Sequence, residues 1–340
     1  MEPKIKHLFY CPFTGLGLHN GFRGNKWLKN RIQIFKQFVL PSLISQTNQD
    51  FILWISWRRE EKNNTIVKEF IDYLNNIESI HSSREARRKQ IGMEVSGRSF
   101  SIVHTFSGVC FYDDKYPDEM ARDRLITSLH GSMGELLNVI GECDYVLMTI
   151  QPSDDLYHRT AVEGIQKLFV AHPEFQAVGF KKGYICNYMT KEVAEYNPLT
   201  NPPFYTIKFP REIFIDPLKH AQYTALKQDS GKYKIGTPCP SHEYVGLCFK
   251  YASVGDLRGF LVGTHGVNIS TTFSNPYKGL PVEKEVLKDF GIYDVTVLKI
   301  RMSFFKIFLL KLPFRVQRKL RYIINEWKVF KLSTWPGLIK

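Results

Sequence analysis

The sequence lacks the features that define several common classes of protein. Its six cysteines are spread over 340 residues and none lies in a CxxC pair, which argues against a zinc ribbon, a thioredoxin-like site and a disulfide scaffold. The first residues contain no apolar segment of signal-peptide length, and no window of about 18 residues is both apolar and free of charge, so no spanning helix is predicted. We therefore expect a protein of a reducing, cytoplasmic compartment.

Acidic residues are scarce in one part of the chain. The sequence has 46 Lys and Arg against 33 Asp and Glu, which gives a net charge of +13. Residues 301–340 hold ten basic residues and one acidic residue, whereas the first 300 residues hold 36 basic and 32 acidic residues. The net charges of the two parts are therefore +9 and +4. We divide the chain into a body, residues 1–300, and a basic tail, residues 301–340.

The basic tail also carries aromatic side chains. These are Phe304, Phe305, Phe308, Phe314, Trp327, Phe330 and Trp335. Basic residues interleaved with aromatic ones are typical of an amphipathic helix on an anionic membrane, which would hold the protein at the inner face of the membrane. A C-terminal helix docked on the body with its basic face in solvent explains the pattern equally well. The tail has no nucleic-acid recognition motif, so nucleic acid is not the expected partner.

In the body, short apolar runs alternate with stretches of helical spacing. The apolar runs predict buried strands at residues 7–13, 51–57, 101–106 and 144–150. Helical spacing predicts helices at residues 27–44, with an interruption at Pro41, and at 66–77 and 123–140. This alternation predicts an α/β fold of Rossmann type, a mixed, mainly parallel sheet flanked by helices. Ligands of such sheets bind outside the carboxyl ends of the strands.

Two adjacent carboxylates, Asp154 and Asp155, follow the predicted strand 144–150. Such a pair repels itself unless a cation lies between the two groups, and Mg²⁺ or Mn²⁺ prefers oxygen ligands and keeps substrate phosphates in its shell. The pair therefore indicates a metal that bridges the protein to a nucleotide diphosphate. As an alternative, either aspartate caps a helix over residues 157–170, which needs no metal.

Three segments resemble known motifs of one protein family. The residues that carry the resemblance are Phe22-Arg23, Trp27, Arg31, Phe35, Leu40-Pro41-Ser42-Leu43, Gln46-Thr47, Phe51 and Trp54, then MTIQPSDDL at 148–156 and GTHGVNIS at 263–270. Together they resemble the rhamnosyltransferase family, over residues 7–275. The resemblance implies a GT-A type nucleotide-sugar glycosyltransferase. The acidic motif of that family usually reads TRxDxDDAL, and this chain has Pro152 in place of its first Asp and Ile150 or Gln151 in place of its Arg.

The resemblance and the needs of glycosyl transfer give a set of candidate site residues. For Mn²⁺ or Mg²⁺ the predicted ligands are Asp154, Asp155 and His265. For the nucleotide sugar the predicted residues are Thr14, Arg23, Arg58, Arg124, Asp154 and Asn268. For the base that deprotonates the acceptor they are Glu243 and, second, Asp216.

Each of these assignments has a structural alternative. His265 is equally explained as a strand-end histidine bonded to a backbone carbonyl, and Asn268 as an Asx-turn residue. Glu243 fits the first turn of a helix capped by Ser241. The arginines fit a solvated surface.

The sequence thus predicts an enzyme that moves a sugar, rhamnose or another deoxysugar, from a nucleotide-diphosphate donor to a polysaccharide or lipid-linked glycan. The main alternative is a nucleic-acid or membrane binding protein on an α/β scaffold without catalysis. A metal-dependent hydrolase using Asp154, Asp155 and His265 is disfavoured, because the sequence has no second His/Asp cluster of the kind that two-metal hydrolases use.

Overall fold

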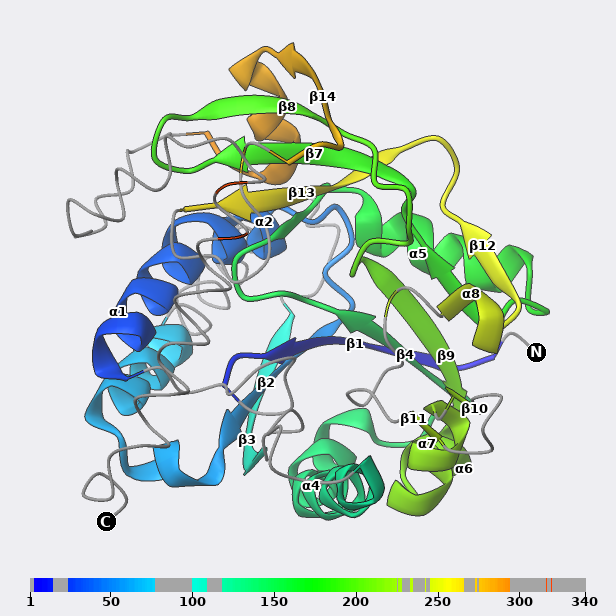
Figure 1. The fold of residues 1–340 in the computed structure, drawn as a ribbon. Coiled ribbons are helices and arrows are strands. Elements are labelled where there is room, and N and C mark those ends of the chain that lie inside the picture. Colours follow the sequence, from blue (N-terminus) through cyan, green and yellow to red (C-terminus); the bar gives the residue numbers. More distant parts are fainter. Residues whose placement is uncertain are drawn as a thin grey trace, which may run out of the picture.

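Two β-sheets organise the part of the chain that the computed structural model describes (Figure 1). The described residues are 3–14, 24–76, 100–108, 118–224, 226–227, 233–234, 242, 245–265, 273, 275–293, 316 and 319, with the backbone alone for 108, 118–125, 226–227 and 233–234. Apart from two residues, the predicted basic tail lies outside them.

The larger sheet has seven strands in the order β12-β6-β9-β4-β1-β2-β3. Its strands are β1 Ile5–Pro12, β2 Ile52–Arg58, β3 Ser101–Gly108, β4 Tyr145–Ile150, β6 Ala177–Gly179, β9 Tyr205–Pro210 and β12 Tyr251–Ser253. All neighbouring pairs are parallel except the two that β9 makes, with β4 and β6, which are antiparallel. The predicted mixed, mainly parallel sheet is confirmed.

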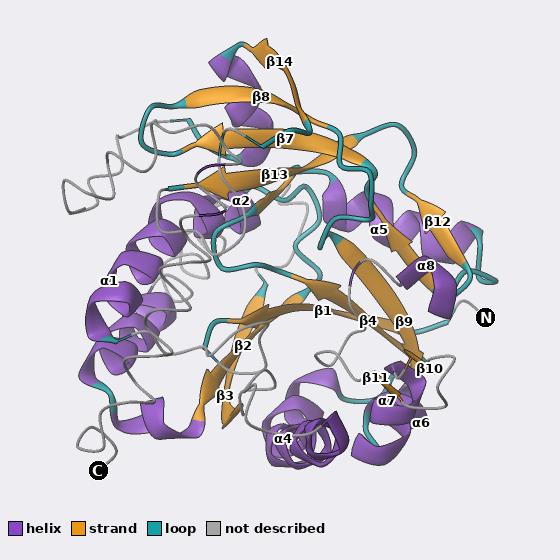
Figure 2. Ribbon diagram, viewed as in Figure 1, coloured by secondary structure: helices purple, strands orange, loops and turns teal. Residues whose placement is uncertain are grey.

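Alternate residues of the central strand β1 enter two separate cores, because side chains alternate across a strand. Phe9 and Cys11 belong to the core on one face, and Leu8 and Tyr10 to the core on the other. The first face is covered by α1 Asn25–Ile34, η1 Phe35–Val39, α2 Leu40–Ile44, a helix over residues 65–76 and α5 Ala161–Ala171 (Figure 2). The second face is covered by α4 Asp118–Ile140, α6 Arg211–Phe214 and α7 Pro217–Thr224.

The smaller sheet was not anticipated by the sequence. It has five strands in the order β14-β8-β7-β13-β5, which are β5 Leu156–Tyr157, β7 Lys182–Asn187, β8 Glu192–Tyr196, β13 Arg258–Thr264 and β14 Lys278–Val282. Its apolar residues, such as Ile185 and Phe260, belong to the same core as Phe9 of the larger sheet. The two sheets therefore share one apolar interior. The remaining short elements are η2 Arg59–Asn63, β10 Leu226–Lys227, β11 Tyr233–Lys234, α8 Val245–Cys248 and η4 Lys284–Phe290.

Two helices differ from their predicted positions. Pro41 does not end the helical stretch of residues 25–44, since α1, η1 and α2 follow one another without a gap, and it lies directly after the π-helical turn η1. The helix predicted over residues 157–170 begins at Ala161, since Leu156 and Tyr157 pair with β13 as β5. Asp154 and Asp155 are therefore not caps of that helix, whose N-cap is Thr160.

The register of the larger sheet decides which segments meet. Tyr10 of β1 lies opposite both Trp54 of β2 and Ile150 of β4, so the residues that follow these three strands leave from the same edge. β9 runs the other way, and its last residue, Pro210, lies opposite Tyr145, the first residue of β4. The segment after β9 therefore leaves from the opposite edge.

Candidate functional site

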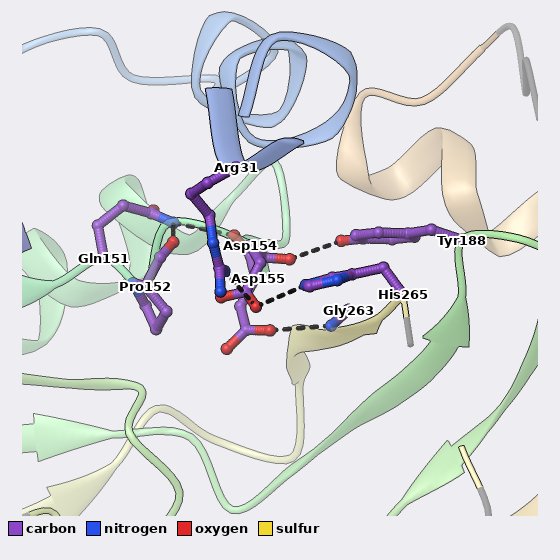
Figure 3. A network of polar contacts seen from close by, with 8 residues as sticks. All are labelled: Arg31, Gln151, Pro152, Asp154, Asp155, Tyr188, Gly263 and His265. Atoms are coloured by element: carbon purple, nitrogen blue, oxygen red, sulfur yellow. Dashed lines mark hydrogen bonds and ion pairs between the residues drawn. The ribbon is translucent and has the colours of Figure 1, made fainter. Parts of the chain in front are cut away.

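Six residues from distant parts of the chain meet where β4 ends (Figure 3). We call them the Asp154 cluster; they are Arg31 on α1, Asp154 and Asp155 after β4, Tyr188 after β7, Gly263 on β13 and His265 after it. The cluster joins both sheets and α1, so its geometry depends on the packing of the whole body.

Asp154 is the centre of the cluster. Its Oδ2 forms an ion pair with the Arg31 guanidinium and lies 3.0 Å from His265 Nε2. A carboxylate can only accept, so Nε2 carries the proton. The side chains are 16%, 5% and 0% exposed for Asp154, Arg31 and His265. Burial alone would raise the pKa of Asp154, but Arg31 and His265 together hold that pKa below its usual value, so Asp154 is an anion.

Asp155 has a different environment. Its Oδ1 accepts the backbone N–H of Gly263 at 2.8 Å. Burial, followed by the charge of Asp154, raises the pKa of Asp155 well above its usual value. A Cβ at Gly263 would lie 2.3 Å from the carbonyl oxygen of Asp154 and 2.4 Å from the Tyr188 ring, so only glycine allows this approach.

The loop that carries both aspartates is fixed by neighbouring side chains. Gln151 Nε2 donates to the carbonyl oxygens of Pro152, at 2.8 Å, and Asp155, at 2.9 Å. Tyr188 donates its hydroxyl proton to the carbonyl oxygen of Asp154 at 2.9 Å, and its ring stacks on Phe38 at a centroid distance of 3.8 Å. Pro152 and Gln151, the two departures from the family motif, thus lie in a turn that Gln151 closes.

The three predicted metal ligands lie together but are not arranged as a ligand set. Asp154 Oδ2 is shared by Arg31 and His265, and the His265 nitrogen that faces it is protonated and has no lone pair for a metal. Within the described residues, no group of three or more His, Cys, Asp or Glu side chains is gathered to hold an ion. In this arrangement the residues do not fit Mn²⁺ or Mg²⁺, and dependence on either ion stays a prediction.

A second group of polar residues lies at the ends of β1 and β2 and just after them. We call it the Thr14 cluster; it consists of Thr14, Ser56, Arg58 and Glu61. Thr14 donates its hydroxyl proton to Glu61 Oε2, while Thr14 Oγ1 accepts the N–H of Arg58 at 3.3 Å. The Thr14 N–H donates to the carbonyl oxygen of Ser56 at 3.3 Å. Glu61 is 4% exposed, burial raises its pKa, and its buried Oε1 has no hydrogen-bond partner among the described residues. Arg58 is partly exposed and pairs with Glu60 at 3.3 Å.

The two clusters lie at the same edge of the sheet. Thr14 follows β1, Arg58 ends β2 and Asp154 follows β4, and the register places the ends of these three strands side by side. Among the predicted nucleotide-sugar residues, the structure therefore brings Thr14, Arg58 and Asp154 to one edge.

The other predicted site residues are not part of these clusters. Asp216 follows β9, at the opposite edge, and its Oδ1 accepts the N–H groups of Leu218 and Lys219 at the start of α7. A carboxylate in that place caps a helix and does not face Asp154. Arg124 lies on α4, for which its backbone alone is described. The predictions for Arg23, Glu243 and Asn268 lie outside the described residues.

Part of the chain matches a known protein family. The model of the family described as "Putative rhamnosyl transferase" matches residues 22–83. The resemblance to the rhamnosyltransferase family is confirmed over this segment. The matched rhamnosyltransferase segment contains Arg31, Arg58 and Glu61, and it ends before the motif of Asp154.

Comparison with curated proteins gives no match. Among solved structures, a crystal structure of S. aureus TarS 1-349 is similar with 12% identity and a TM-score of 0.32, over 76% of this chain and 60% of that one. The same TarS fragment in complex with UDP is similar with 11% identity and a TM-score of 0.30, over 93% of this chain and 78% of that one. At these TM-scores neither structure supports an argument about this chain.

Five residues of the two clusters were not predicted from the sequence as site residues: Arg31, Tyr188, Gly263, Ser56 and Glu61. Arg31 was visible as part of the family signature, but its partner lies in another segment. Glu61 was visible as an acidic residue just after β2. Gly263 lies on β13 of the smaller sheet and Tyr188 directly follows its strand β7, and the sequence did not reveal this sheet. Within the described residues, no helix is long and apolar enough to cross a membrane.

Proposed function

We propose that the protein is a glycosyltransferase whose donor is a nucleotide-diphosphate sugar. The observation that carries the proposal is the ion pair between Arg31 and Asp154. Arg31 lies in the segment that matches the rhamnosyltransferase family, whereas Asp154 lies in the acidic motif beyond that match. Two separate parts of the sequence resemblance thus meet in one buried cluster, at the sheet edge where α/β proteins bind their ligands.

We expect the nucleotide to lie against the Thr14 cluster. Arg58 is partly exposed there, and a guanidinium pairs with phosphate oxygens through charge-assisted hydrogen bonds. Within the part of the chain that the structure describes, the buried Glu61 Oε1 has no partner, and a buried acceptor of this kind gains from an N–H or O–H of the base or ribose. The sugar and the bond to be broken would then face Asp154 and Asp155.

The finer parts of the proposal concern the sugar, the acceptor and the place of action. We propose transfer of rhamnose or another hexose-derived sugar to a polysaccharide or lipid-linked glycan, with the basic tail on an anionic membrane. Flotation of the full chain with anionic vesicles, and loss of flotation in a chain that stops at residue 300, would support the tail assignment. Equal flotation of both chains would contradict it.

The central experiment measures binding and turnover of nucleotide sugars. Calorimetry with UDP, GDP and dTDP identifies the nucleotide, and turnover is then followed with the corresponding nucleotide sugars and a glycan acceptor. We expect Asp154→Ala and Asp155→Ala to lower turnover at least about a hundredfold, the scale of losing a preorganised charged group at the reacting centre.

Asp256→Ala is the matched control, because Asp256 is 99% exposed and forms an ion pair with the exposed Lys182 at 3.4 Å. This variant is expected to behave like the unchanged protein. The proposal is wrong if no nucleotide binds, or if the two cluster variants turn over the donor as fast as the control.

A further inference from the structure

The carboxylate of Asp154 is paired with a positively charged side chain of the protein. The Arg31 guanidinium, 5% exposed, forms an ion pair with Asp154 Oδ2, and the protonated nitrogen of His265 lies 3.0 Å from the same oxygen. The carboxylate of Asp154 is thus neutralised by protein groups alone. Asp155, beside it, bonds to the N–H of Gly263.

Arg31 is also fixed in this position. It lies on α1, its guanidinium carbon is 5.4 Å from the centre of the Trp27 ring, and its helix packs its apolar side chains into the core. A buried arginine that loses its carboxylate partner is left as an uncompensated charge, so swinging Arg31 away from Asp154 is unfavourable.

A divalent ion at Asp154 would compete with this arrangement. It would lie within a few ångströms of the Arg31 charge, in a buried place where like charges are weakly screened, and at Oδ2 it would compete with Arg31 and His265, which already contact that oxygen. Binding of the ion at Oδ2 therefore requires Arg31 to move away and the His265 proton to leave Nε2. Each of these steps opposes metal binding.

We propose that Arg31 is the resident cation of the Asp154 cluster and takes the place of the divalent ion that the sequence predicted. The cluster binds neither Mn²⁺ nor Mg²⁺, and the donor nucleotide binds without either ion. The second statement rests on the proposed function, whereas the first concerns only the protein and a metal ion.

The first test is a titration of the protein with Mn²⁺, followed by the electron paramagnetic resonance signal of the free ion. The unchanged protein and Asp154→Asn are expected to give the same weak binding, because the cluster holds no ion. Arg31→Met, which removes the guanidinium and leaves the aspartates, is expected to bind Mn²⁺ more tightly by at least about tenfold, since the competing charge is gone. Arg31→Met is also expected to gain thermal stability when Mn²⁺ is added, because a ligand stabilises the state that binds it.

Two variants separate the role of Arg31 from a general effect of charge. Arg31→Lys keeps a cation and should bind Mn²⁺ as weakly as the unchanged protein. Arg159→Met removes an exposed arginine that pairs with Asp289, 3.6 Å away, and should leave Mn²⁺ binding unchanged. If Arg31→Met does not fold, the comparison of the unchanged protein with Asp154→Asn decides the matter alone. The proposal is overturned if the unchanged protein binds Mn²⁺ at a site that Asp154→Asn abolishes.

The second test is calorimetry of nucleotide binding in EDTA and in Mn²⁺. Equal affinity in both solutions supports the proposal, and binding that requires Mn²⁺ overturns it. If no nucleotide binds in either solution, the proposed glycosyltransferase function fails, while the Mn²⁺ titration still decides whether Arg31 excludes the ion.

Discussion

At one edge of the seven-stranded sheet Asp154 holds Arg31 in a buried ion pair, while at the other edge Asp216 caps α7 in contact with solvent. Both aspartates follow strands of the same sheet, and both accept hydrogen bonds. They differ because β4 and β9 are antiparallel, so their ends lie at opposite edges, and only the edge after β4 is covered by α1 and the smaller sheet. The comparison shows that the elements packed against the end of a strand determine whether the aspartate after it forms a buried ion pair or caps an exposed helix.

Removal of the buried partner should have the largest effect. Asp154→Ala leaves Arg31 buried without its carboxylate, and we expect the free energy of unfolding to fall by about 3–5 kcal/mol. Urea denaturation measures this loss. A loss no larger than that of Asp216→Ala would mean that the two aspartates stabilise the protein equally, contrary to the comparison.

A side chain at Gly263 should disturb the same edge somewhat less. In Gly263→Ala the new Cβ meets the Asp154 carbonyl oxygen and the Tyr188 ring, which should cost about 1–3 kcal/mol of unfolding free energy. The control is Gly134→Ala on α4, where a Cβ meets nothing within 4 Å and should stabilise the helix by about 0.5–1 kcal/mol. Thermal unfolding gives the change in Tm for each variant. Equal changes in Tm would show that the Gly263 backbone does not pack tightly against Asp154 and Tyr188.

Asp216→Ala should have a small and pH-dependent effect. The backbone N–H of Lys219, followed by that of Leu218, keeps the pKa of Asp216 below its ordinary value of 3.8. A carboxylate whose pKa is lower in the folded state stabilises the protein above the unfolded pKa, and this stabilisation disappears as the pH falls through the folded pKa. The difference in Tm between the unchanged protein and the variant should therefore shrink in acid.

The same variant also tests a role in catalysis. Because Asp216 lies at the edge opposite Asp154, turnover of the donor should not change in Asp216→Ala. A loss of turnover with nucleotide binding retained would instead support Asp216, the second of the two candidate bases that the sequence predicted.

The smallest effect is expected for an exposed ion pair at the Asp216 edge. Glu142 is 87% exposed and lies 3.2 Å from Arg211, at the start of α6. Such pairs contribute little, so Glu142→Ala should change the unfolding free energy by no more than about 0.5 kcal/mol, and less in high salt. A change as large as that of Asp154→Ala would remove the distinction between buried and exposed pairs on which the comparison depends.

The central strands of the fold could be predicted from the sequence because each is a local apolar run. The runs at 7–13, 51–57 and 144–150 became β1, β2 and β4, and the position of Asp154 after the last of them followed. The antiparallel strand β9 and the smaller sheet could not be predicted in this way. Their pairing joins segments far apart in the chain, and no local pattern encodes such a contact.

The site was predictable where its residues lie in local sequence motifs, but the contacts between those motifs were not. Asp154, Asp155 and His265 were named from motifs, and they do lie together. The ion pair with Arg31 was not foreseen, because the arginine stood in a different motif and only the packing of α1 against the end of β4 brings it to the aspartate.

The hydrogen bond between Asp154 and His265 joins residues that are 111 positions apart, and that between Gly263 and Asp155 spans 108 positions. Closing such long loops makes these contacts slow and late to form. A nascent or cleaved chain that stops before β13 contains the acidic motif and Arg31 but not the groups that complete the cluster. We therefore expect the Asp154 cluster to be complete only when almost the entire body has been synthesised and folded.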